Sequence, residues 1–132
     1  MQGRPRRRAK IVLAVCALVG TLLGLIGIHY LLIPESAARS FGLPGPPTGH
    51  ELHDIVGLRN LWLGALAVGL AALRQWHGLA VWFSIGGFVC FADARLVTNA
   101  TGELPQVAFH LACGVLFWYL AAVCWRSGNK GR

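Results

Sequence analysis

Four long apolar segments dominate the sequence and leave few folds open to it. They cover residues 11–33, 54–73, 78–97 and 105–125. Each is close to the roughly 20 residues that an α-helix needs to cross the hydrocarbon core of a bilayer. Lipid cannot satisfy backbone polar groups, so segments of this kind cross a membrane as helices. The sequence therefore predicts an all-α fold, an integral membrane four-helix bundle that forms one domain over residues 11–125.

Charge is sorted along the chain in a way that predicts the threading of these helices. Nine of the twelve basic residues lie in the tails 1–10 and 126–132, in which no acidic residue occurs, and in the loop 74–77. Cytoplasmic loops and tails carry the excess of Lys and Arg in membrane proteins. We therefore expect a multi-pass protein of the cell (inner) membrane with both termini in the cytoplasm. The net charge of +7 then reflects attraction to anionic headgroups, and we expect no nucleic-acid partner.

Polar side chains interrupt the apolar segments at one common depth. With the termini inside, Arg59 and His110 each lie about 7.5 Å from the outer end of their segments, and Asp93 about 6 Å. His29 lies just below the outer end of the first segment, and Asn60 follows Arg59. An unpaired charge in the membrane costs several kcal/mol, so we expect Arg59 to pair with Asp93, with Asn60 and His110 completing the hydrogen bonds.

This polar layer has two readings that the sequence leaves open. A buried ion pair can simply fix the register of the helices. Ionisable groups inside a membrane are more often functional, which favours a ligand-binding layer of Arg59, Asn60, Asp93, His110 and His29. If the protein is an enzyme, His110 and Asp93 are its candidate acid and base.

Small residues form stripes on the first two segments. Gly20, Gly24 and Gly27 share one face of the first, and a stripe from Gly57 through Gly64 to Ala71 runs along the second. Such stripes allow helices to approach closely in lipid, within one chain or between two copies. In the loop between these segments, "SAARSF" (36–41) predicts a short amphipathic helix on the outer surface, with Phe41 and Leu43 dipping inward; a plain connector is the alternative.

The sequence carries no sign of a metal or cofactor. The four cysteines all fall inside apolar segments, where thiols behave as small buried hydrophobes. No Cys-x-x-Cys pair and no glycine-rich nucleotide motif is present, so we expect no bound metal and no cofactor.

Several motifs taken together resemble a family of uncharacterised four-span membrane proteins, domain of unknown function 4267, loosely DoxX-like in layout. The resemblance runs from the Phe-Gly-Leu-Pro at 41–44, through Gly57 and Arg59, to Asp93 and His110. It implies a shared four-helix fold and a shared polar layer, but no reaction. Asn60 departs from the pattern, since the family more often has an acid there. Asp93 is therefore the expected partner of Arg59. A proton-transfer role assigned to the acid that the family has at position 60 is in doubt for this chain.

Three functions follow as hypotheses. The first is binding of a small amphiphile or lipid-like molecule at the outer polar layer, with Arg59 meeting an anionic or carbonyl head. The second is a membrane enzyme that acts on a lipid-like substrate by acid-base catalysis. The third is an accessory subunit of a membrane complex, with a purely structural Arg-Asp pair. Expected partners are membrane lipids, an amphiphilic small molecule, and a second copy or another membrane subunit.

Overall fold

The computed structural model describes residues 3–44 and 51–130. Within these residues it contains five α-helices and no strand: α1 (Gly3–Leu32), α2 (Pro34–Phe41), α3 (Glu51–Ala72), α4 (Trp76–Ala100) and α5 (Leu104–Asn129). The four longer helices are each long and apolar enough to cross a membrane. The predicted all-α fold with four spanning helices is therefore confirmed. Part of the "GLPGPP" turn, at residues 45–47, lies outside the described residues.

The long helices extend beyond the predicted spans at most ends. α4 and α5, for example, continue to Ala100 and Asn129, past the predicted ends at 97 and 125. A helix continues beyond the hydrocarbon because its hydrogen bonds stay within the segment wherever it runs. α1 stops at Leu32 because Pro34, which has no backbone N–H, starts α2 as its first helical residue.

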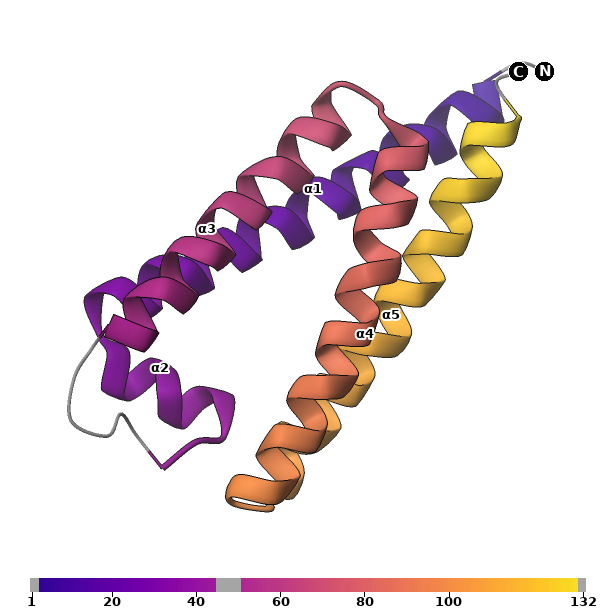
Figure 1. Ribbon diagram of the computed structural model, residues 1–132. Coiled ribbons are helices and arrows are strands. Elements are labelled where there is room, and N and C mark those ends of the chain that lie inside the picture. The colour runs from indigo at the N-terminus through magenta and orange to yellow at the C-terminus, as the bar shows by residue number, and fades with distance from the viewer. Residues whose placement is uncertain (1–2, 45–50, 131–132) are drawn as a thin grey trace.

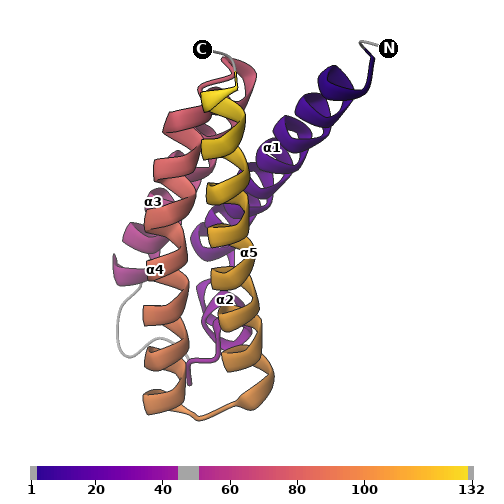
Figure 2. The ribbon, with the colours of Figure 1, turned by 90° about the vertical axis from the view of Figure 1, so that its right-hand side faces the viewer.

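The long helices are arranged as two pairs rather than as one evenly packed bundle. α1 packs along α3, and α4 packs along α5, whereas contacts between the two pairs are few. The first turns of α1 splay away from α5 (Figure 2). Beyond them the pairs meet beside the α3–α4 connection, where Cys16 of α1 contacts Cys124 of α5, and they diverge toward α2 (Figure 1). We call these the closed end and the open end. Both tails therefore leave the helices at the closed end.

The α1–α3 seam is formed by the two stripes of small residues. A Cβ atom at Gly27 would lie 2.6 Å from the carbonyl oxygen of Gly57, and one at Gly20 would lie 2.9 Å from the Cβ of Ala67. The buried residues of α3 are those of its predicted stripe, with His53 added. The stripes therefore bring two helices of one chain into backbone contact, as small residues do in lipid.

At the closed end, a compact apolar core joins the pairs. Phe83 of α4 and Leu120 of α5 are buried there together with Cys16 of α1 and Cys124 of α5. The two thiols lie 3.7 Å apart, so a sulfur contact links α1 to α5. The pairs are held together at this end by side chains that are almost entirely removed from solvent.

At the open end, the short helix α2 lies in the mouth between the two pairs (Figure 1). Gly42 ends α2 with a φ of 102°, and the N–H of Leu43 donates to the carbonyl of Ala38. This is a glycine C-cap that needs the left-handed conformation. Ala37 and Ala38 are buried, Phe41 and Leu43 are half-buried, and Arg39 is exposed. The predicted amphipathic helix is confirmed.

Candidate functional site

His110 fastens α2 to the α4/α5 pair. Its side chain is only 7% exposed, and its Nε2 lies 3.2 Å from the carbonyl oxygen of Phe41 at the end of α2. The Phe41 ring packs on the imidazole with the ring centroids 4.5 Å apart. Close by, the Thr101 hydroxyl donates to the carbonyl of Gly42 at 2.7 Å. The imidazole that was expected to complete a charged pair instead holds the short helix in place.

Arg59 and Asp93 do not form the expected ion pair. Both are described residues, and no salt bridge joins them: the Arg59 side chain is exposed and Asp93 is half-buried. The reason lies in the helix pairing, because Arg59 belongs to α3 and Asp93 to α4, and these helices sit in different pairs with few mutual contacts. The predicted direct pairing is wrong.

Tyr30 and His53 complete the layer from the α1/α3 side. Their rings stack with centroids 5.9 Å apart at an interplanar angle of 26°. Tyr30 is 5% and His53 is 9% exposed, and the His53 Nδ1 atom is buried without a hydrogen-bond partner among the described residues. A buried polar atom without a partner costs about 1–3 kcal/mol, so it marks a place where a partner is missing.

Asn60 and His29 occupy different surroundings. Asn60 is buried on the α3 stripe that faces α1, and its amide makes no hydrogen bond to another described side chain. His29 is half-buried on α1, one residue before Tyr30. Successive helical residues point about 100° apart, so His29 cannot point toward α3 in the same direction as Tyr30. The structure brings Asn60 into the α1–α3 seam, and among the described residues His29 makes no side-chain hydrogen bond to another candidate.

We use the name polar layer for Tyr30, His53, Arg59, Asn60, Asp93 and His110, which come from all four long helices. Arg59, Asp93 and His110 lie about 9–12 Å from the helix ends nearest α2, at the usual rise per residue. The layer combines one cation, one carboxylate, an amide, a phenol and two imidazoles. No three Cys, His, Asp or Glu side chains gather in metal-binding geometry within residues 3–44 and 51–130. Hydrogen bonding to a polar group is the chemistry that this set offers.

Two members of the polar layer, Tyr30 and His53, were absent from the candidates chosen on sequence. A signal for His53 was available, because it lies four residues before Gly57 and seven before Asn60, on the small-residue stripe itself. Residues at these spacings share one face of a helix. The stripe therefore points His53 toward α1, and the buried Tyr30 is the ring that it meets there.

Comparison with known proteins identifies a family. The family model described as Domain of unknown function (DUF4267) matches residues 17–126, which cover the second half of α1, all of α3 and α4, most of α5 and every member of the polar layer. No curated protein and no solved structure matches the chain. The chain therefore belongs to the DUF4267 family of uncharacterised domains.

Proposed function

We propose that this membrane protein binds a small amphiphile, with the polar head of that molecule at the polar layer and its tail among the apolar helix surfaces. The proposal rests on one observation: most side chains of the polar layer make no hydrogen bond to another described residue. Of the six members, only His110 has a side-chain hydrogen bond to another described residue, and His53 Nδ1 is both buried and unpartnered. A layer that served only to lock helices would satisfy its own polar groups.

The chemistry of the layer favours an anionic or carbonyl head. Arg59 and the Asn60 amide offer N–H donors, and Tyr30 offers a hydroxyl. Arg59 is exposed rather than tied to Asp93, so its guanidinium is free to meet an acceptor. α2 lies across the mouth of the open end and contributes Phe41 beside His110, which supports a role for it in covering the head.

Binding of defined probes to the purified full-length protein in detergent tests this proposal. We expect oleate, and more weakly methyl oleate, to raise the thermal unfolding midpoint, whereas oleylamine leaves it unchanged because its cationic head meets Arg59. Arg59→Gln should lower the affinity for oleate about tenfold, in line with loss of one charge-assisted hydrogen bond of about 1.5 kcal/mol or more.

Arg95→Gln is the matched control, because Arg95 is another exposed arginine near the open end of α4 that is not part of the polar layer. It should leave the response to oleate intact. Equal losses in the two variants, or equal responses to oleate and oleylamine, would rule the site out. Turnover of a bound ester that depends on His110 would instead identify an enzyme.

The proposal extends to threading. Both tails leave the closed end, and those tails hold most of the basic residues, which supports a cytoplasmic closed end and an open end that faces outward. The polar layer would then receive amphiphiles from the outer leaflet of the cell membrane.

A further inference from the structure

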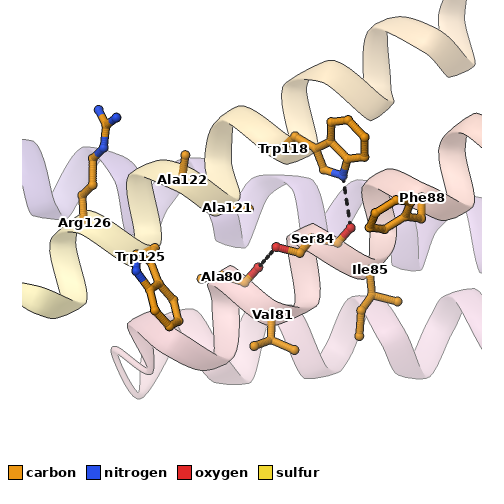
Figure 3. A pocket seen from close by; sticks show the side chains of 10 residues that line it. All are labelled: Ala80, Val81, Ser84, Ile85, Phe88, Trp118, Ala121, Ala122, Trp125 and Arg126. Carbon is orange, nitrogen blue, oxygen red and sulfur yellow. Dashed lines mark hydrogen bonds between the residues drawn. The ribbon is translucent and has the colours of Figure 1, made fainter.

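A groove runs along the membrane face of the α4/α5 pair, from the closed end to Phe88, which lies five residues before Asp93 of the polar layer. Its volume is about 550 Å³, within the range of small-molecule sites. Small residues, Ala80 and Ala121 among them, line its floor (Figure 3). Phe88 and Trp118 stand at one end, and Trp125 and Arg126 at the other. The groove exists because alanines lie between large aromatic side chains on adjacent helices.

The polar side-chain atoms of Ser84 and Trp118, which line the groove, already have hydrogen-bond partners in the protein. The indole N–H of Trp118 donates to the carbonyl of Ser84 at 3.2 Å, and the Ser84 hydroxyl donates to the carbonyl of Ala80 at 2.8 Å (Figure 3). An occupant therefore needs no polar group along the length of the groove. The apolar side chains that line the groove are complementary to a hydrocarbon chain.

Arg126 is the charged residue among those that line the groove. Its side chain is exposed, its guanidinium points away from the groove floor (Figure 3), and it makes no ion pair with another described residue. The adjacent Trp125 is 52% exposed, as expected for an aromatic ring at the membrane–water boundary. The groove thus offers an apolar channel of about 12 Å, from Phe88 to the Ala80 level, that ends beside one free cation.

We propose that this groove binds an anionic phospholipid of the leaflet at the closed end, with one acyl chain between α4 and α5 and the phosphate on Arg126. A second copy of the chain fits less well. Closed dimers in which the same groove faces itself would bring two Arg126 side chains together, because such an interface is self-complementary. An anionic headgroup would pair with the positive charge of Arg126, whereas a second copy would bring another positive charge next to it. This site is independent of the polar layer.

Native mass spectrometry of the full-length protein in mild detergent tests the proposal, with dioleoyl phosphatidylglycerol and dioleoyl phosphatidylcholine as probes. We expect the phosphatidylglycerol adduct to be about fivefold more abundant at equal lipid concentration, as one basic residue near an anionic surface supplies. Arg126→Gln should abolish that preference, and Arg126→Lys should retain most of it. Ala122→Phe, which places a ring in the groove, should reduce retention of both lipids.

Matched controls separate a site from general lipid contact. Arg74→Gln removes an exposed arginine at the closed end that does not line the groove, and Ala112→Phe adds a ring to an exposed position of α5 outside it. Both should bind phosphatidylglycerol like the wild type. The proposal fails if Arg74→Gln acts like Arg126→Gln, or if Ala122→Phe retains lipid fully. It also fails if the wild type is a dimer that Ala122→Phe converts to a monomer.

Discussion

At the scale of residues, the polar layer holds side chains whose needs the surrounding protein does not meet. His53 shows this most directly, since its ring is stacked and buried but its Nδ1 atom has no partner among the described residues. A buried nitrogen without a hydrogen-bond partner lowers the free energy of unfolding. The proposal of a bound amphiphile rests on this atom and on the few hydrogen bonds of the layer.

The substitution His53→Phe should therefore stabilise the ligand-free protein. Phenylalanine keeps the stack on Tyr30 and removes the unpartnered nitrogen, which should raise the free energy of unfolding by about 1 kcal/mol or more. His77→Phe is the control, because the His77 Nε2 lies 3.1 Å from the Asn129 oxygen and its removal breaks a contact. Thermal unfolding in detergent measures both. A loss of stability in His53→Phe would show that the imidazole has a structural partner after all.

The sequence predicted that Arg59, Asp93 and His110 lie at similar distances from the helix ends on one side, because position within an apolar segment follows from counting residues. It did not predict their partners. Arg59 and Asp93 share a depth but belong to different helix pairs, and nothing in a single sequence states which helices pair. His110 was expected to contact Asp93 and instead bonds to the Phe41 carbonyl, which lies 69 residues away in a segment with weak sequence signals.

At the scale of elements, glycine stripes decide how α1 and α3 meet. Their spacing of three and four residues was visible in the sequence, and the structure uses both stripes within one chain. α2 was harder to predict, since eight residues between a proline and a glycine carry little periodicity. Its amphipathic character was nevertheless predicted, whereas its Gly42 cap was found only in the structure.

The substitution Gly27→Ala should destabilise the α1–α3 pair. The added Cβ would lie 2.6 Å from the Gly57 carbonyl oxygen and 2.7 Å from the Leu61 nitrogen, both backbone atoms that cannot rotate away. Overpacking of this kind costs about 1–3 kcal/mol. Gly69→Ala is the matched control, with no atom within 4 Å of the added Cβ, and should keep or raise stability. Equal midpoints for Gly27→Ala and the wild type would mean that the seam is looser than described.

At the scale of the whole molecule, the closed end is a sealed apolar core and the open end carries the polar groups. The sequence predicted this asymmetry from the distribution of charges, although the divergence of the two helix pairs required the structure. The DoxX-like layout stays a prediction, because no solved structure matches the chain.

Reporter fusions test the threading that this asymmetry supports. With the closed end in the cytoplasm, green fluorescent protein fused after residue 132 should fluoresce and alkaline phosphatase at the same place should be inactive. Fusions at residue 102, between α4 and α5, should behave in the opposite way. Active phosphatase at the C-terminus would reverse the orientation and place the polar layer toward the cytoplasm.

The most direct test of the central claim is a double-mutant cycle on thermal stability in detergent, with Arg59→Ala, Asp93→Ala and both changes together. If Arg59 and Asp93 serve a ligand and do not stabilise each other, the losses of unfolding free energy in the two single variants should add to within about 0.5 kcal/mol. A helix-locking ion pair behaves differently: breaking a buried pair costs about 3–5 kcal/mol, and removing the second partner recovers much of it. Sharp losses in both single variants with recovery in the double variant would contradict the account.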